Sequence, residues 1–223
     1  MFAGHIGVGL AVGRAERRVN VGVFVGAALL LDLVLWLLVL LGMEAVTIPV
    51  NFASAHQPDF VFPYSHGLLA SVLWSTVAGA VALLGCSSRP ALKWRVAVLV
   101  AAAVFSHWLL DALVHRPELP LTGSTSSVVG LALWNNMPVA LGAEATIVAV
   151  GLYLFVPRSG MSRGRSIALT VLTLVVLAFT GAGMTIAPPP PSALAMAGSS
   201  LATLGVVCAL FCWLGGHPRD GRT

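Results

Sequence analysis

Charged side chains are scarce in this sequence. Only 9% of its 223 residues are Asp, Glu, Lys or Arg, whereas 58% are hydrophobic. A soluble domain carries roughly a quarter charged residues, and this much apolar surface is too large to bury in one small soluble core. The composition excludes an ordinary soluble domain and indicates that the lipid bilayer is the solvent of the chain.

Several local signatures are missing as well. The sequence contains no phosphate-cradling glycine loop, no dinucleotide fingerprint and no Ser-His-Asp spacing typical of a serine hydrolase. Its three cysteines, Cys86, Cys208 and Cys212, form no CxxC pair and are interpreted as small apolar side chains. The formal net charge of +4 comes from short scattered clusters, so no nucleic-acid partner is expected. No basic region precedes the first apolar run, so no removable signal peptide is expected.

Six apolar runs are each close to the ~20 residues that cross the hydrocarbon core. They cover about 20–42, 66–86, 96–115, 128–156, 166–187 and 194–215. Residues 1–13 form a shorter stretch, which would be a half-helix, a re-entrant segment or an interfacial one. The sequence therefore predicts an all-α fold: one integral membrane domain over residues 1–223, a polytopic bundle of about six spans plus a short N-terminal half-helix.

The basic residues divide the predicted loops into two kinds. Eleven of the twelve fall before the first run, between the second and third, between the fourth and fifth, or after the sixth. Only Arg116 lies on the opposite side, together with the acidic residues Glu44, Asp59 and Glu118. Because cytoplasmic loops are enriched in Lys and Arg, the pattern predicts a multi-pass protein of the plasma (inner) membrane with a cytoplasmic C-terminus.

Ionisable side chains inside a membrane are expensive and are functional candidates by default. At ~1.5 Å rise per residue, Asp32 and His107 lie ~18 Å from the cytoplasmic edge. Glu144 and Asp111 lie at ~21 Å and ~24 Å. A half-helix at the N-terminus would bring His5 to ~13 Å, and His66 opens the second span on the outer side. The sequence thus predicts one polar site from mid-bilayer to the outer half, with Asp32, His107, Asp111 and Glu144 in one slab and His5 and His66 approaching it from either side.

Two of these residues form the sharpest local motif. His107 and Asp111 are four residues apart on a predicted helix, so their side chains share one face. This spacing suits two ligands of one metal, or a carboxylate that orients an imidazole. The alternative is an internal polar lock between helices. Asp32 has no local partner in its apolar run, so it must be neutral, paired or bound to a metal.

Other features carry smaller expectations. Ser65 is a predicted helix N-cap, which would point His66 into an outer mouth or leave it as an interfacial structural histidine. Glu144 has small neighbours that permit close helix packing, so a packing role is its alternative. Arg116 is placed to hold an anionic group such as phosphate.

Pro138 falls early in the predicted fourth span. A proline at this point frees a backbone carbonyl near residue 134, so a kinked and polar helix start is expected there. The alternative is an interfacial belt formed by Trp134 and the neighbouring Asn residues. The remaining histidines lie in predicted loops or at the ends of spans, and they are expected to be ordinary solvated side chains: His56, His115 and His217.

The order of these motifs matches a known pattern. It runs from Gly4-His5 through Asp32 on the first long helix, Ser65-His66, and Ser-His-x-x-x-Asp over 106–111, to Leu133-Trp134. Over residues 1–145 this order resembles the YdjM-like family of membrane-bound metal-dependent hydrolases, which look like distant relatives of zinc-dependent phospholipase C. Typical members carry an additional His-Arg before the second helix, and this chain does not. The resemblance implies a divalent metal, zinc, and hydrolytic activity at the inner membrane.

Three functions are open at this point. The first is a membrane-embedded metal-dependent hydrolase that acts on a phosphoester or other ester, lipids included, from the outer leaflet. Its metal ligands would be His5, Asp32, His66, His107 and Asp111. Glu144 would then be the general base or a further ligand, and Arg116 a phosphate clamp. The second function is a proton- or cation-coupled transporter. The third is a non-catalytic membrane scaffold, a role that also suits the last two helices at 166–215.

Overall fold

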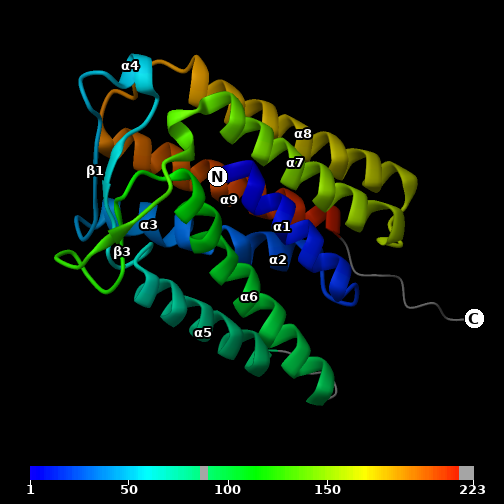
Figure 1. Cartoon of the computed structure of the whole chain (residues 1–223). Coiled ribbons are helices and arrows are strands. Elements are labelled where there is room, and N and C mark those ends of the chain that lie inside the picture. The colour runs from blue at the N-terminus through cyan, green and yellow to red at the C-terminus, as the bar shows by residue number, and fades with distance from the viewer. Residues whose placement is uncertain (86–89, 216–223) are drawn as a thin grey trace, which may run out of the picture.

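The computed structural model describes residues 1–85 and 90–215. Cys86, Arg89, His217, Arg219 and Arg222, which entered the expectations above, lie outside the described residues. The described chain is a bundle of α-helices (Figure 1). In chain order the helices are α1 (Phe2–Ala15), α2 (Val21–Ala28), α3 (Leu30–Leu40), α4 (Phe52–Ala55), α5 (Leu68–Gly85), α6 (Pro90–Val114), α7 (Met137–Phe155), α8 (Arg163–Thr185) and α9 (Ala193–Gly215).

Five of these helices are long and apolar enough to cross a membrane, namely α5 to α9. A sixth span is formed if α2 and α3 are counted as one, although their axes are bent by 51° at Leu29. The predicted all-α membrane bundle with about six spans is therefore confirmed. The first span is nevertheless broken in its middle, whereas the apolar run over 20–42 was expected to continue through.

The half-helix at the N-terminus is α1, and it is buried inside the bundle. Most of its residues are inaccessible, and it packs along α7 and α2 (Figure 1). Small residues allow this close approach, since a Cβ on Gly7 would lie 2.7 Å from the carbonyl oxygen of Ile147 on α7. Of the three placements that the sequence left open, the structure shows a half-helix enclosed by the spans.

The fourth span starts later than the apolar run at 128–156 predicts. Residues before it form strand β4 (Val128–Val129) and the 3₁₀-helix η1 (Leu133–Asn135), and α7 begins at Met137. The Asn136 side chain accepts a hydrogen bond from the Val139 amide and caps the helix. Pro138 lies in the first turn, where a helix needs no amide hydrogen, so the expected kink does not occur.

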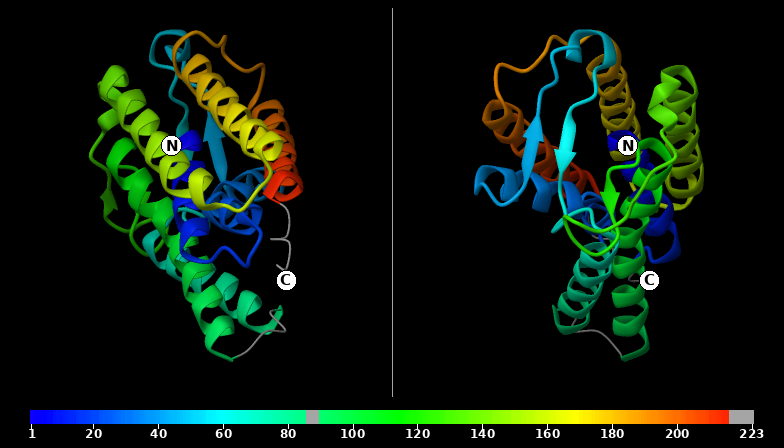
Figure 2. Two further views of the ribbon diagram at one scale, coloured as in Figure 1. Left: turned by 90° about the vertical axis from the view of Figure 1, so that its right-hand side faces the viewer. Right: turned by 60° about the vertical axis from the view of Figure 1, so that its left-hand side comes forward.

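Short β-hairpins cover one end of the bundle, although the sequence predicted only loops there. Strand β1 (Ala45–Thr47) pairs antiparallel with β2 (Asp59–Val61), and β3 (Leu119–Pro120) pairs with β4. Figure 2 shows both hairpins and α4 beside the ends of the long helices. A further 3₁₀-helix, η2 (Val156–Arg158), connects α7 to α8. The hairpins hold the chain segments on either side of them against the ends of α3 and α6.

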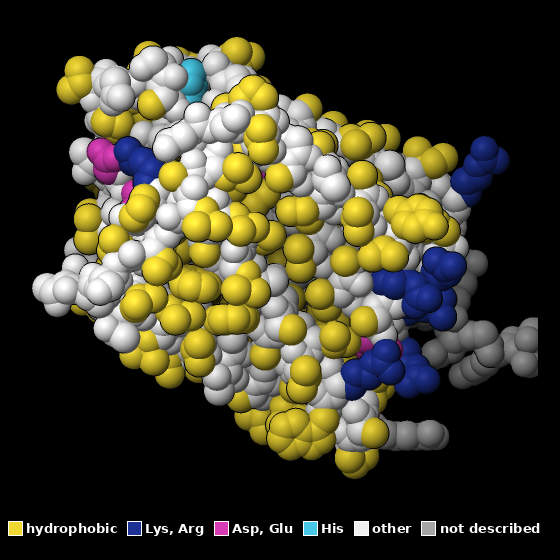
Figure 3. All heavy atoms as spheres, viewed as in Figure 1, with side chains coloured by type: hydrophobic (Ala, Val, Ile, Leu, Met, Phe, Trp, Pro, Cys, Tyr) yellow, Lys and Arg dark blue, Asp and Glu magenta, His cyan; other side chains and the backbone are white. Residues whose placement is uncertain are grey.

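Basic side chains gather at the other end of the bundle (Figure 3). There Arg17 donates to the carbonyl of Arg158, and Arg95 pairs with Glu16. Arg116 lies apart from this group and pairs with Asp59 on β2. The described part of the bundle therefore has one basic end and one hairpin-covered end, and the separation of the basic residues from Arg116 follows the distribution of charges along the sequence.

Candidate metal centre

The five predicted metal ligands come together inside the bundle. The break between α2 and α3 brings Asp32 into the interior, and α6 presents its His-Asp face to the same point. His66 arrives on the turn before α5, and His5 arrives on the enclosed α1. Two overlapping groups of three have ligand atoms within 4.8 Å of one another: His5, Asp32 and His107, and His66, His107 and Asp111.

The second group has the dimensions of a metal site. The Nε2 atoms of His66 and His107 are 3.2 Å apart. The Oδ2 atom of Asp111 lies 3.2 Å from His107 Nε2 and 3.4 Å from His66 Nε2. Ligand atoms at ~2.0–2.1 Å from a tetrahedral zinc ion are separated by about 3.3 Å. These three atoms therefore form one face of such a tetrahedron.

Asp32 is a further candidate ligand beside the two histidines. Its Oδ1 atom lies 3.6 Å from His107 Nε2 and 3.7 Å from His66 Nε2. Its side chain is 21% exposed, whereas those of the other three residues are at most 3% exposed. The Asp32 carboxylate is thus the most accessible of these four candidate ligands.

Both histidines have their outer nitrogens committed as donors. His107 Nδ1 lies 2.7 Å from the Ala28 carbonyl oxygen, which can only accept, so this nitrogen carries the hydrogen. Ala28 is the last residue of α2, and the final carbonyls of a helix have no intrahelical partner. The break in the first span therefore fixes the His107 tautomer and leaves the Nε2 lone pair facing the centre.

His66 is fixed through a serine and a buried glutamate. The Ser65 hydroxyl lies 2.7 Å from Glu44 Oε2 and 2.8 Å from His66 Nδ1. If the hydroxyl donates to the carboxylate, its oxygen accepts the hydrogen of Nδ1, and Nε2 again presents a lone pair. Ser65 was expected to cap α5, but the helix begins at Leu68, and the serine belongs to this relay.

Glu44 also holds the backbone of the turn that carries His66. Its Oε1 atom accepts from the backbone amides of Tyr64 and Ser65, and the residue is only 5% exposed. Burial raises the pKa of the Glu44 carboxyl, because desolvation outweighs the hydrogen bonds that Ser65 and Tyr64 donate. From the sequence, Glu44 was expected only to be a charged residue of a loop, because no local motif joins it to His66.

His5 contacts the opposite oxygen of Asp111. Its Nε2 atom is 3.2 Å from Asp111 Oδ1, and its ring stacks on that of His107 with the centroids 3.7 Å apart. The α-amino group of Met1 also lies 3.2 Å from Oδ1. His5 Nδ1 is buried and is without a hydrogen-bond partner among the described residues. A buried nitrogen in this state is costly unless a further group, such as a cation, satisfies it.

His115 lies beside the centre, so the prediction that it is a solvated side chain is wrong. It was expected to be solvated, but it is 6% exposed and its Nε2 atom lies 3.8 Å from Asp111 Oδ2. Its Nδ1 atom is 2.6 Å from Glu118 Oε1, so it repeats the pattern of an outer nitrogen held by an acceptor. The signal was present in the spacing, because His107, Asp111 and His115 are each four residues apart.

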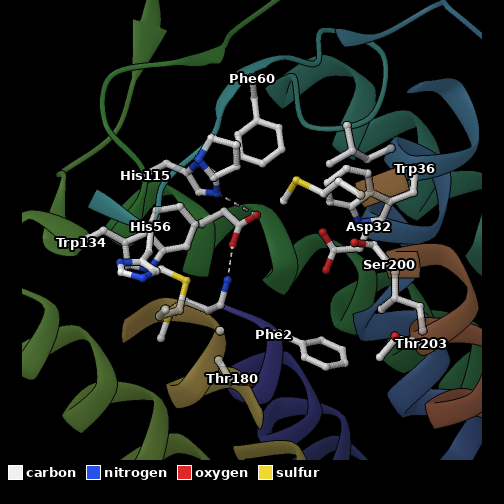
Figure 4. A pocket seen from close by; sticks show the side chains of 18 of the residues that line it. Phe2, Asp32, Trp36, His56, Phe60, His115, Trp134, Thr180, Ser200 and Thr203 are labelled. Atoms are coloured by element: carbon white, nitrogen blue, oxygen red, sulfur yellow. Dashed lines mark hydrogen bonds and ion pairs between the residues drawn. The ribbon is translucent and has the colours of Figure 1, made fainter. Parts of the chain in front are cut away.

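A cavity of about 350 Å³ adjoins the centre (Figure 4). Asp32 and His115 reach it from different elements, and aromatic rings such as Trp36 and Phe60 line it. Glu144 lines it too: its Oε2 atom accepts from the Gly4 amide at 3.1 Å, which joins α7 to α1. His56, half-buried rather than fully solvated, is also in the lining.

Two expected catalytic groups therefore have different positions. Glu144 borders the cavity and belongs to neither group of candidate ligand atoms, and its bond to the Gly4 amide fits the packing role that the sequence left open. Arg116 is outside the cavity lining and is engaged by Asp59 at 2.6 Å. The structure does not bring this arginine to the centre, because β2 holds the partner that its guanidinium prefers.

Comparisons of the chain with family models, curated proteins and solved structures find no match. The candidate centre is therefore argued from its own geometry.

We expect Glu44→Gln to weaken metal binding by about 10–100-fold, the usual effect of losing a partner that orients a ligand. The new amide would donate to Ser65, which would turn the hydroxyl hydrogen toward His66 Nδ1 and move the ring hydrogen to Nε2. Titration of metal-free protein with zinc measures the change. Glu16→Gln, at the buried carboxylate of the basic end, is the matched control and should bind zinc as the wild type does.

Proposed function

We propose that this protein is a membrane-embedded, metal-dependent hydrolase that cleaves a phosphoester or another ester. One observation carries the proposal: two imidazole nitrogens lie 3.2 Å apart, each lies 3.2–3.7 Å from a carboxylate oxygen of Asp111 and one of Asp32, and both imidazoles are held by acceptors on their far side. This donor set suits zinc. At this separation the imidazole lone pairs and the carboxylate oxygens repel one another unless a cation or a proton lies between them.

A divalent ion at this position would make water acidic enough to act as a nucleophile near neutral pH. The chain's own residues supply the rest. The Glu144 carboxylate accepts a proton as the water oxygen bonds to the phosphorus or acyl carbon. The P–O or C–O bond to the leaving group then breaks, and the proton passes to the leaving oxygen. His115, held by Glu118, lines the same cavity and positions the substrate there.

Two further lines support this reading. The motif order over residues 1–145 resembles the YdjM-like membrane-bound metal-dependent hydrolases, and all of the motif's His and Asp residues meet at the centre. The basic end of the bundle fits a cytoplasmic side. We therefore orient the protein in the plasma (inner) membrane with α9 running toward a cytoplasmic C-terminus, which turns the hairpin-covered end and the cavity toward the outer leaflet.

The activity is tested with purified, zinc-loaded protein. Bis(p-nitrophenyl) phosphate and p-nitrophenyl butyrate serve as phosphoester and carboxylic ester probes. We expect hydrolysis of at least one probe, its loss on chelation, and its return on adding zinc. Glu144→Gln should lower kcat by about 10²–10⁴-fold, the usual contribution of a general base, while zinc content stays constant. Zinc-loaded wild-type protein that cleaves neither ester would overturn the proposal.

The break at Leu29 favours one second candidate, a proton- or cation-coupled transporter. Discontinuous helices with an acidic residue near the break are typical of transport sites, and Asp32 lies three residues beyond this one. Such helices usually occur as a related pair, whereas the described residues contain a single bent pair. Zinc or proton flux into proteoliposomes that Asp32→Asn abolishes, without ester hydrolysis by the wild type, would decide for transport.

A further inference from the structure

We infer that the substrate of this centre is a membrane lipid, whose hydrocarbon chain enters the cavity sideways through a mouth between α8 and α9. The inference rests on the proposed function, because it names the substrate class of the same site. It assigns to the last two helices a role that their lack of ionisable residues did not indicate.

The first argument is the lining of the cavity. At the centre it is polar, with Asp32, His66, Asp111 and Glu144 on its wall. Away from the centre the wall is built from apolar side chains such as Phe2, Leu35, Trp36, Met184 and Met196. Its volume of about 350 Å³ falls in the ~300–1,000 Å³ range of small-molecule sites. An elongated apolar molecule with one polar group fits this gradient.

Second, the cavity extends from the centre toward helices α8 and α9. The C-terminal part of the chain forms one wall of the cavity. This wall consists of one face of α8, from Phe179 to Met184, and one face of α9, from Met196 to Leu204. Phe179 is 58% exposed and Ser199 is exposed, so the lining reaches the outer surface of the bundle. Ser200 and Thr203 lie on the same side of the cavity in Figure 4. The cavity thus extends from the centre to a gap between two helices.

The third argument is what surrounds that gap. Both α8 and α9 are long and apolar enough to span a membrane, so their outer faces meet hydrocarbon rather than water. The mouth lies in the last two turns of α8 and the first three turns of α9, which is the half of the bundle away from the basic end. A lipid in the adjacent leaflet has its chain at this level and its ester groups closer to the hairpin-covered end.

The fourth argument is the open space at the mouth. Gly183 lines the cavity, and a Cβ built on it would meet nothing within 4 Å. Gly181 offers equal space but is not part of the lining, since residues two apart on a helix point to different sides. Gly183→Trp should therefore fill the mouth without disturbing α8, and Gly181→Trp is its matched control.

Binding is measured with full-length protein in proteoliposomes that contain a phosphatidic acid with a photoactivatable acyl chain. We expect cross-links at residues 179–184 of α8 and 196–204 of α9. Gly183→Trp should lower this labelling by about an order of magnitude, because displacing even two methylene groups weakens binding about fifteenfold. Gly181→Trp should label as the wild type does. Labelling spread over all lipid-facing helices and unchanged by Gly183→Trp would overturn the inference.

Hydrolysis provides the second readout. With zinc-loaded protein, kcat/KM for a series of esters with one head group should rise about fourfold per added methylene until the cavity is filled. Gly183→Trp should abolish this dependence and leave zinc content unchanged. If short and long esters are cleaved equally well, the hydrolase proposal stands and the lipid inference fails. If neither is cleaved but the labelling pattern is found, the cavity binds lipid and the hydrolase proposal fails.

Discussion

His107→Ala is expected to remove the divalent ion from the purified protein. The imidazole belongs to both groups of candidate ligand atoms, and its Nε2 atom lies 3.2–3.6 Å from the nearest donor atoms of His66, Asp111 and Asp32. The loss of affinity should therefore exceed the ~10–100-fold that removal of an orienting partner costs. Elemental analysis of protein purified without added chelator measures the effect, with about one ion per wild-type chain and none in the variant.

A thermal measurement separates this result from simple destabilisation. A ligand at 100 times its Kd stabilises a folded protein by ~2.7 kcal/mol, so zinc should raise the Tm of the metal-free wild type. The Tm of metal-free His107→Ala should not respond to zinc. His56→Asn is the matched control: His56 has φ of 50°, which asparagine tolerates, and it belongs to neither ligand group.

The opposite outcome has a clear meaning. A wild type without metal whose Tm ignores zinc, and a His107→Ala variant that is merely less stable, would show that a proton occupies the space between the lone pairs. The cluster would then be a polar lock between helices, and the protein a membrane scaffold.

Gly151→Val is expected to displace α1 and to weaken the centre from a distance. Helices α1 and α7 cross so closely that a Cβ on Gly151 of α7 would collide with the carbonyl group of Gly7 on α1. Backbone atoms are unable to yield as a flexible side chain does, so the clash should cost at least the ~1–3 kcal/mol typical of overpacking. Because α1 carries His5 and the amide that binds Glu144, zinc affinity and hydrolysis should both fall.

The control for this variant lies on the same helix. Gly142→Val adds the same isopropyl side chain to α7, at a position where a Cβ meets nothing within 4 Å. It should retain the wild-type Tm, zinc affinity and activity. Equal losses in both variants would show that the effect does not come from the contact with Gly7, and unchanged zinc affinity in Gly151→Val would show that α1 is dispensable for the centre.

The spans and the ligands were predictable from the sequence for different reasons. Twenty-residue apolar runs separated by basic or polar segments have few alternatives in a membrane, so the helices followed from composition. Ionisable residues in such runs must find partners in the interior, so Asp32, His107 and Asp111 were predicted to be near one another. The interatomic distances still required the structure, because rotation of each helix about its axis is set by packing.

The remaining features had no local signal or a misleading one. His115 was predicted at the very end of the third span, next to Arg116 and Pro117, and was therefore expected to be solvated, yet its amide bonds to the Asp111 carbonyl and keeps the residue on the inward face of α6. Glu44 reaches its serine across twenty-one residues of loop and hairpin. Leu29, where the first span bends, is neither proline nor glycine. The bend coincides instead with a hydrogen bond that His107 on α6 donates to the Ala28 carbonyl.

The enclosed α1 has a consequence for the order in which the protein is made. Its fourteen residues are fewer than a span needs, and its polar side-chain and amide bonds reach far ahead in the sequence: His5 bonds to a residue 106 positions later and Gly4 to one 140 positions later. At about 5–20 residues per second, the ribosome needs roughly 7–28 s to reach Glu144 after Gly4 has been made. During biosynthesis the packing of α1 is therefore completed only after α7 has been inserted, although α2 is available to it much earlier.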